Sequence, residues 1–283
     1  MPALIDIRRR IRSVKNTQQI TKALKMVSAA KLRRAQESMF AARPYARTMA
    51  QVLKDVAARN EGEENHPLFR ATSKEGRVLV IVVTSDKGLC GPFNSSLLRV
   101  SQRFLVDNAH RQILVDAVGR KGRDFLRRRT TIRKEYIGVF QALVFSKAQE
   151  IAQSAMKAFL DREVDEVVLL FNEFKSVIQQ RIVTQRLLPL QAVEGEKKGT
   201  QEYLYEPDPR AIFDKLLPKI VETTVWQALL ESNAAEHGAR MAAMDSATRN
   251  ASQTIDSLTL YMNKVRQAAI TKEIIEVVSG SAA

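Results

Sequence analysis

The chain has few of the residues that enzymes of its size use for chemistry. Its 283 residues include one cysteine, Cys90, and three histidines, His66, His110 and His237. A single cysteine excludes a disulfide framework and a cysteine-histidine metal cluster, so we expect no metal, no cofactor and a reducing compartment. No histidine falls in a loop that would place a base beside Cys90. We therefore predict no catalytic residues.

Long apolar runs are also missing. Nowhere do about eighteen apolar residues follow one another, and the first residues lack the apolar core of a signal peptide. Any association with a membrane should therefore be indirect. The Arg-rich, acid-poor start is compatible with a mitochondrial transit peptide. However, the apolar spacing that begins at Leu4 continues into the following residues. This favours a helix that belongs to the folded protein over a transit peptide.

The last third of the chain, residues 210–278, has the strongest periodic pattern. Apolar residues recur at alternating intervals of three and four between Phe213 and Ala269. This spacing is typical of a coiled coil, because it keeps one apolar stripe facing a second helix. A helix of this length would measure roughly 100 Å. Since a compact globule of this chain length is much smaller, we expect the helix to need a partner. Four polar residues interrupt the stripe: Thr223, Gln227, His237 and Thr248.

Residues 1–60 are predicted to supply the partner helix. The same spacing begins at Leu4, fails at Gln18 and resumes one position early, at Ile20. Pro44 is expected to kink or restart the helix. The positions that carry this stripe are Leu4, Ile7, Ile11, Val14, Ile20, Leu24 and Val27.

Pairing the polar interruptions of the two helices predicts an antiparallel register. Gln18 then lies opposite Thr248, Ile11 faces Ile255, and Val27 lies against Gly238, where a missing side chain permits close approach. In this register the first helix ends near Met262. The apolar residues beyond it should face another protein: Ile270, Ile274, Ile275, Val277 and Val278.

Residues 61–208 have a different spacing of apolar residues. Short apolar, β-branched runs predict strands over 78–83, 113–118, 132–139, 167–171 and 176–188. Helical spacing lies between them, around 97–105, 125–126 and 146–160. Strands that alternate with helices predict a parallel or mostly parallel sheet. The predicted fold is therefore α/β plus coiled coil, with a Rossmann-like α/β domain (61–208) inserted between N-terminal (1–60) and C-terminal (209–283) helices of a long antiparallel two-helix coiled coil.

The loop after the first predicted strand, residues 84–92, is where Rossmann-like folds bind phosphates. It matches neither the dinucleotide fingerprint nor the P-loop, because its glycines are three residues apart and no Lys-Ser/Thr pair opens the next helix. We expect no nucleotide site. Cys90, near Lys87, could be an activated thiol, but a structural or contact cysteine is favoured.

Positive charge is concentrated at the N-terminus. Residues 1–60 hold 14 lysines and arginines against 3 aspartates and glutamates. Such a surface indicates an acidic partner or a phosphate backbone. One alternative is therefore a coiled-coil nucleic-acid-binding protein, although the few aromatic residues do not interleave with the basic ones. A nucleotide-dependent α/β enzyme is the second alternative, and it needs the phosphate loop that is missing.

Five ordered motifs resemble the gamma subunit of F-type ATP synthases, and together they cover nearly the whole chain. The motifs are ITKALKMVSAAKL (20–32), SDKGLCG (85–91), YLYEP (203–207), ARMAAM (239–244) and RQAAITKE with EVVSG (266–273 and 276–280). The resemblance implies a non-catalytic rotor whose coiled coil turns inside a ring of three alpha and three beta subunits. Its α/β domain would touch the epsilon subunit and the membrane ring of c subunits, with no nucleic-acid partner. It also implies ATP synthesis coupled to hydrogen ion transport, at the cytoplasmic face of a bacterial plasma membrane rather than the mitochondrial matrix side.

The resemblance also implies partner contacts. Arg266, Gln267 and Thr271 match positions that hydrogen-bond to a loop of the beta subunit, and Leu24 matches a contact position on the first helix. Tyr203, Tyr205 and Glu206 match the foot near the c ring. Asp86 and Cys90, in the second motif, are further candidate contacts. The chain lacks the extra segment of chloroplast-type gamma subunits, and one cysteine cannot form their regulatory disulfide, so we expect no redox control.

Overall fold

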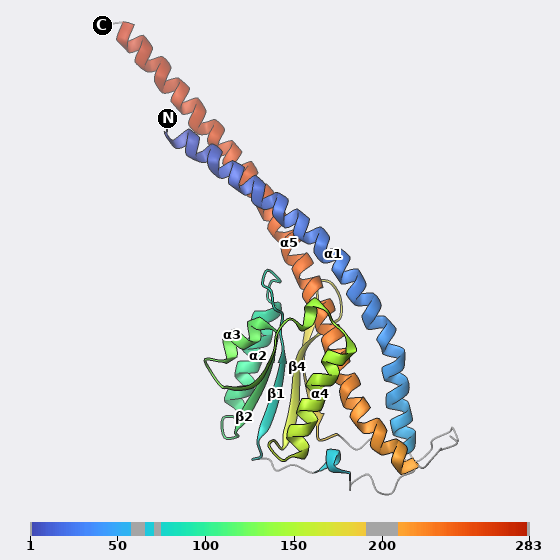
Figure 1. The fold of residues 1–283 in the computed structure, drawn as a ribbon. Helices are drawn as coiled ribbons and strands as arrows, with labels where there is room; N and C mark the ends of the chain where they lie inside the picture. Colours follow the sequence, from blue (N-terminus) through green and yellow to red (C-terminus); the bar gives the residue numbers. More distant parts are fainter. Residues whose placement is uncertain (1, 58–65, 71–74, 191–208, 282–283) are drawn as a thin grey trace. The chain divides into compact units, whose positions relative to one another are not determined.

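The computed structural model describes residues 2–57, 66–70, 75–190 and 209–281 (Figure 1). Two long helices, α1 (Pro2–Ala57) and α5 (Pro209–Ser281), enclose an α/β segment in the sequence. Its strands are β1 (Val78–Val83), β2 (Ile113–Val118), β3 (Thr131–Tyr136), β4 (Glu166–Phe174) and β5 (Gln180–Leu188). Its helices are α2 (Phe93–Asp107), α3 (Arg120–Leu126) and α4 (Phe145–Leu160), with short 3-10 helices at Pro67–Phe69 and Val139–Gln141.

The chain divides into two compact units. The first, which we call the terminal helix pair, contains Met1–Ala30 and Arg240–Ala283; the second, which we call the α/β unit, contains Lys31–Ala239. Both α1 and α5 therefore contribute to both units. The predicted domain boundaries near residues 60 and 208 lie outside the described residues and stay predictions.

In the terminal helix pair, α1 buries a continuous stripe at three-four spacing. Leu4 and Ile7 are buried, and the stripe does not fail at Gln18, as the sequence had indicated. It continues through polar side chains, of which Thr21 and Ser28 are buried. The prediction that the stripe resumes at Ile20 is therefore wrong. The buried or half-buried positions are Leu4, Ile7, Ile11, Val14, Gln18, Thr21, Lys25 and Ser28.

The two helices are antiparallel, as predicted, but their register differs from the predicted one. Thr248 hydrogen-bonds to Thr21 with an oxygen–oxygen distance of 2.8 Å, and Gln18 donates to Ser252 at 2.8 Å. Thr248 is thus displaced by about one helical turn from its predicted partner, Gln18. The predicted register paired Gln18 with Thr248 alone, whereas α1 has a whole polar segment that pairs with polar residues of α5.

The expected close approach of Val27 to Gly238 would join residues of the two units, and it stays a prediction. Val27 is 53% exposed. A Cβ atom added to Gly238 would meet the ring of Phe174 at 3.3 Å and the backbone of Val177 at 3.6 Å, both in the α/β unit. The missing side chain therefore permits α5 to approach the end of β4.

Pro44 lies inside α1, which does not restart there. A proline removes one backbone hydrogen bond and crowds the preceding turn, at a cost of about 3 kcal/mol in an isolated helix. Residues that precede it pack in the α/β unit, with Met39 buried and Arg43 ion-paired to Glu231 of α5 at 3.3 Å. These contacts offset part of the cost.

The sheet has the strand order β3-β2-β1-β4-β5. The four strands β1 to β4 run parallel, and β5 pairs antiparallel with β4. A mostly parallel sheet was predicted and is confirmed. β1 is buried along its whole length, which explains why its sequence is continuously apolar rather than alternating.

One face of the sheet is covered by α2, and the other by α4 together with part of α5. Leu97 of α2 packs against Val80 and Val82, whereas Ile151 of α4 lies in a cluster with Leu79 and Ile81. That second cluster also includes residues of α5: Leu217, Val221, Val225, Ala228 and Leu229. The first turns of α5 are therefore a layer of the α/β unit, a role that the sequence analysis had not assigned to them.

Polar contacts also attach α5 to this unit. Glu231 accepts a hydrogen bond from the backbone N–H of Phe174 at 3.0 Å, and Ser232 accepts one from the N–H of Asn172 at 3.3 Å. Both N–H groups belong to β4. Because buried N–H groups need acceptors, these bonds fix the position of α5 along the strand.

Candidate functional site

The loop between β1 and α2 has its hydrogen-bonding groups turned inward. Asp86 accepts hydrogen bonds from the backbone N–H groups of Arg120, at 3.0 Å, and Gly138, at 3.1 and 3.2 Å. Thr84 accepts one from the N–H of Gly122 at 2.7 Å. The loop side chains therefore bind backbone N–H groups of the neighbouring segment, residues 120–138. The expectation that the loop is not a nucleotide site stays a prediction.

Gly119 holds this loop against the start of α3. Its φ of 88° lies in the left-handed region, and an added Cβ would come within 2.1 Å of the carbonyl oxygen of Thr84. Only glycine permits this approach. The loop is thus rigidly packed around Thr84 and Asp86.

Cys90 lies inside the loop and not on its surface. It is 2% exposed, and its sulfur accepts a hydrogen bond from Nδ2 of Asn94 at 3.1 Å. The sulfur also lies 3.9 Å from Oγ of Ser85. Burial of the thiol favours the structural alternative that the sequence left open, and the assignment of Cys90 as a partner contact stays a prediction. The exposed apolar side chain of the loop is Leu89, with a φ of 61°.

The end of α5 is a second candidate site. Figure 1 shows α5 continuing past the first residues of α1 within the terminal helix pair. Its buried stripe ends near Ala269, and Arg266, Gln267 and Thr271 are exposed. The hydroxyl of Thr271 donates to the carbonyl of Gln267 at 2.9 Å, as is common within helices. Four apolar side chains nearby are exposed: Ile270, Ile274, Ile275 and Val277.

A third candidate site lies on the outer face of α1. Ile20 is 60% exposed, Val27 is 53% exposed, and Leu24 between them is half-buried. Residues seven apart lie on the same face of a helix, so these side chains form a second apolar stripe beside the polar stripe that faces α5. We call Ile20, Leu24 and Val27 the outer stripe. The sequence pattern had detected these residues but assigned them to the wrong face.

Charged side chains flank the polar segment between the two helices. The ammonium group of Lys25 hydrogen-bonds to the carboxylate of Asp245, which also pairs with Arg249 at 3.1 Å. The hydrogen bond from Lys25 lowers the pKa of Asp245 below its ordinary value, and the positive charges of Lys25 and Arg249 lower it further. Asp245 is therefore ionised at neutral pH.

Other candidate residues are placed less completely. Tyr203, Tyr205 and Glu206 lie outside the described residues. Val278 belongs to α5, but its side chain is outside the described part. Their assignment as partner contacts stays a prediction.

The described residues contain neither a cluster of metal ligands nor a helix able to span a membrane. Across residues 2–57, 66–70, 75–190 and 209–281, no group of three or more potential metal ligands occurs. No helix in the described part of the chain combines the length and the apolar character needed to cross a membrane.

Comparison with known proteins identifies the family. The sequence model of the ATP synthase family matches residues 3–283. The ATP synthase gamma chain of Solibacter usitatus is 52% identical over 100% of this chain and 99% of its own length. The gamma chain of Chlorobaculum parvum is 48% identical over 99% of this chain and 98% of its own.

Solved structures agree. A chain from the central stalk and c ring of the mitochondrial ATP synthase of Tetrahymena thermophila matches with a TM-score of 0.63 and 28% identity, over 81% of this chain and 99% of that one. A chain of the Euglena gracilis mitochondrial ATP synthase matches with a TM-score of 0.68 over 100% of this chain and 94% of that one; at 19% identity, it supports the fold alone. The family model and the relatives at about 50% identity show that the present chain belongs to the ATP synthase gamma chain family, and its helices and mixed sheet agree with this.

Proposed function

We propose that this chain is the central rotor shaft of an F-type ATP synthase. It couples proton-driven rotation of the membrane c ring to nucleotide exchange at the catalytic sites of a ring of three alpha and three beta subunits. As a member of the gamma chain family, it is a subunit of the ATP synthase complex. Family membership does not support the nucleic-acid-binding alternative or the nucleotide-dependent enzyme.

One observation carries the mechanism: the terminal helix pair buries polar side chains and exposes apolar ones. Thr21 and Ser28 are buried, whereas Ile20 and Val27 on the same helix are exposed. Burying an exposed side chain of this size contributes roughly 1.5–3 kcal/mol. A helix that turns these residues outward is therefore suited to an apolar enclosure, such as the inside of a subunit ring.

The same helix pair presents different chemistry in different directions. The outer stripe is apolar, while Lys22 and Arg12 on α1 are exposed and basic. A ring of three equivalent sites around such a shaft meets a different surface at each position. Because a contact shifts a conformational equilibrium only when it differs between states, this asymmetry can impose a different nucleotide affinity on each site.

The candidate contacts fall into two groups under this proposal. Arg266, Gln267 and Thr271 bind a loop of the beta subunit, while Ile270, Ile274 and Val278 form an apolar bearing with the ring. This assignment is supported by the exposure of all of these side chains except that of Val278, which is not described.

Contacts toward the membrane form the second group. Tyr203, Tyr205 and Glu206 form the foot at the c ring, whereas the outer stripe, which includes Leu24, faces the alpha and beta subunits and belongs with the first group. The epsilon subunit docks on the α/β unit. Of the loop residues, Asp86 acts inside the loop through Arg120 and Gly138, which makes it a positioning residue for any contact through Leu89.

The proposal also includes a non-catalytic role. Its support is the loop after β1, whose sequence matches neither the dinucleotide fingerprint nor the P-loop. The complex is placed at the cytoplasmic face of a bacterial plasma membrane, and the support is that the relatives reported above include bacterial gamma chains.

A reversible cross-link tests the rotor role. Val27→Cys in the assembled complex, joined by a disulfide to a cysteine in the facing ring subunit, should stop ATP turnover, and reduction should restore it. The matched control joins Val27→Cys to a small soluble thiol, which adds a disulfide without blocking rotation. Turnover that continues after full cross-linking to the ring would rule out rotation of this helix against the ring.

The outer stripe is tested separately. Ile20→Ser with Val27→Ser should weaken assembly with the ring at least tenfold, since it removes two exposed apolar contacts. Gln19→Ser with Lys22→Ser, on the exposed polar surface, is the control. Equal assembly of both double variants would show that the stripe does not contact the ring.

A further inference from the structure

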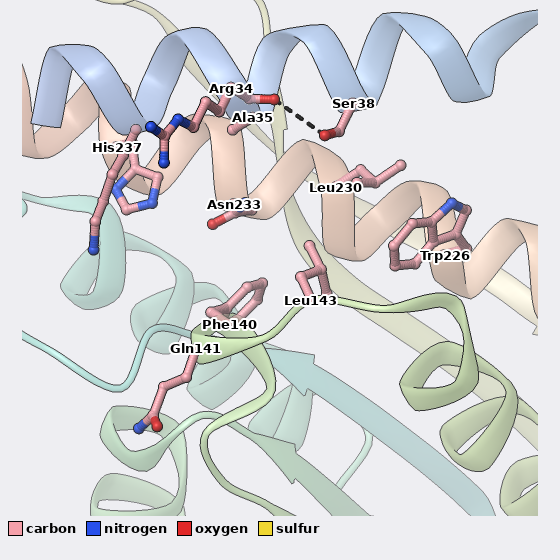
Figure 2. A pocket seen from close by; sticks show the side chains of 11 residues that line it. Arg34, Ala35, Ser38, Phe140, Gln141, Leu143, Trp226, Leu230, Asn233 and His237 are labelled. Carbon is pink, nitrogen blue, oxygen red and sulfur yellow. Dashed lines mark hydrogen bonds between the residues drawn. The ribbon is translucent and has the colours of Figure 1, made fainter.

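The α/β unit contains a cavity of about 370 Å³ that neither the rotor role nor the family assigns to a ligand (Figure 2). It lies between α1, α5 and the segment that leads from β3 to α4. Pockets that bind small molecules commonly range from about 300 to 1,000 Å³. Its size is therefore sufficient for a ligand with one or two rings.

One end of the cavity is cationic. Lys31 and Arg34 are three residues apart on α1, which places them on the same helix face, and His237 of α5 lies opposite. Figure 2 shows the Arg34 and His237 side chains next to each other. Among the described residues, neither Lys31 nor Arg34 forms an ion pair, and none of the lining residues is acidic. This end favours an anion.

The other end is apolar and aromatic. Trp226 and Leu230 of α5 and Leu143 of the opposite segment line it, and Figure 2 shows Leu143 directed toward α5. The Trp226 ring is fixed by an edge-to-face contact with Phe145, with ring centroids 5.8 Å apart. A rigid aromatic wall provides contact area without loss of side-chain entropy and favours a flat apolar group.

Asn233 lies between the two ends. Its Oδ1 atom is buried and has no hydrogen-bond partner in the structure. Figure 2 shows this side chain pointing from α5 toward Phe140, into the cavity. A buried acceptor without a donor is unfavourable, and nearly all such atoms in native proteins find one. Because this atom has almost no exposed surface, a ligand reaches it only if the Asn233 side chain turns.

We propose that this cavity binds an amphipathic aromatic anion. Its acidic head contacts Lys31 and Arg34, and its aromatic body lies against Trp226. The three segments that line the cavity would be held together by such a ligand. Binding should therefore raise the thermal stability of the chain. This proposal does not depend on rotation.

The dye 1-anilinonaphthalene-8-sulfonate is a suitable probe for the full-length chain. It combines a sulfonate, an aromatic body and a bridging N–H group. Trp226 is the single tryptophan of the sequence, so energy transfer from tryptophan to the dye reports binding near this residue. We expect saturable transfer with one site. N-phenyl-1-naphthylamine, which has the same skeleton without the sulfonate, should bind about tenfold more weakly because it lacks a charged hydrogen-bond acceptor.

Matched variants localise the site. Lys31→Gln with Arg34→Gln should weaken the sulfonate at least about tenfold, with little effect on the neutral naphthylamine. The control, Arg12→Gln with Arg33→Gln, removes the same charge from exposed positions that do not line the cavity. Equal affinity of the two dyes, or equal loss in the two double variants, would overturn the proposal. Since all four side chains are exposed, circular dichroism should show that both variants remain folded.

Discussion

The hydroxyl oxygens of Thr21 and Thr248 lie 2.8 Å apart across the terminal helix pair. The hydroxyl of Thr21 donates to its own helix, to the carbonyl of Gln18 at 3.0 Å, which leaves its oxygen free to accept from Thr248. Neighbouring polar pairs support the same alignment, with Gln18 bonded to Ser252 and Lys25 to Asp245. Polar residues inside a coiled coil favour the register that pairs them with one another, because other alignments would place them against apolar side chains.

A cross-link between these positions tests the register. Thr21→Cys with Thr248→Cys should form a disulfide readily under mild oxidation, because adjacent hydroxyls imply a Cβ separation near the roughly 3.5–4.5 Å that a disulfide needs. The control is Gln18→Cys with Thr248→Cys, the pair expected from the sequence. The extent of oxidation is read by gel mobility before and after reduction. Faster closure of the control pair would contradict the observed register.

The sequence predicted α5 of the terminal pair better than α1. Met244 and Ala251 are buried and Ile255 half-buried, as the three-four spacing indicated, because their apolar character and their burial agree. In α1 they disagree: Thr21 is buried and Ile20 exposed. The predicted stripe was placed on apolar residues only. Where the contact between the two helices is polar, as at Thr21, the apolar spacing marks exposed residues such as Ile20 instead.

The α/β unit was predictable for a similar reason. β1 and β2 were predicted with the bounds that the structure has, since continuous β-branched runs leave little ambiguity. The role of α5 as a layer on the sheet was missed because Leu217 and Val221 lie beside the predicted stripe, and a helix buried on several sides has no single periodic face. Likewise, nothing in the sequence indicates that the side chain of Cys90 turns inward.

A pH dependence follows from Glu222, which is buried between α5 and α4. Burial by itself would raise the pKa of this carboxyl, but hydrogen bonds from Lys219, Gln153 and Gln149 lower it below its ordinary value of 4.5. A carboxyl with a lowered pKa in the folded state stabilises the fold above about pH 4.5, and this contribution is lost as the pH falls through the folded-state pKa.

Glu222→Gln should therefore reduce the free energy of unfolding by about 1–3 kcal/mol at pH 7, the range for hydrogen bonds to a charged group. The difference from the wild type should shrink as the pH falls below about 4.5. Urea unfolding at pH 7 and pH 4 measures it, with the exposed Glu163→Gln as control. A difference that grows toward acid pH would show that the pKa of Glu222 is raised, not lowered.

Adjacent residues of α5 should respond to substitution with opposite sign. Ser232→Ala removes the acceptor for the backbone N–H of Asn172, and this unsatisfied donor should cost about 1–3 kcal/mol. Asn233→Leu replaces a side chain whose buried oxygen has no partner, so stability should stay constant or rise by up to about 1–3 kcal/mol. Chemical unfolding of both variants provides the comparison. A loss at Asn233 as large as that at Ser232 would mean that the oxygen of Asn233 has a stabilising partner.

The final prediction concerns Arg266 and Gln267, which are exposed on α5 in the part of the chain described here. Their double replacement by Ala should leave the free energy of unfolding of the chain unchanged, since exposed side chains contribute little to it. In the complex, the same change should lower ATP synthesis about tenfold, because it removes two hydrogen-bonding groups, one of them charged, from the proposed contact with a beta subunit.

The control variant, Arg99→Ala with Gln102→Ala, removes the same residue types from the exposed face of α2. Synthesis by membranes containing each variant is compared at equal complex content, so that a defect in assembly is separated from a defect in coupling. If the α5 variant assembles and synthesises ATP like the control, then the exposed polar groups at Arg266 and Gln267 have no part in coupling. The apolar residues that follow, Ile270 and Ile274, would then be the contact through which the end of α5 acts on the ring.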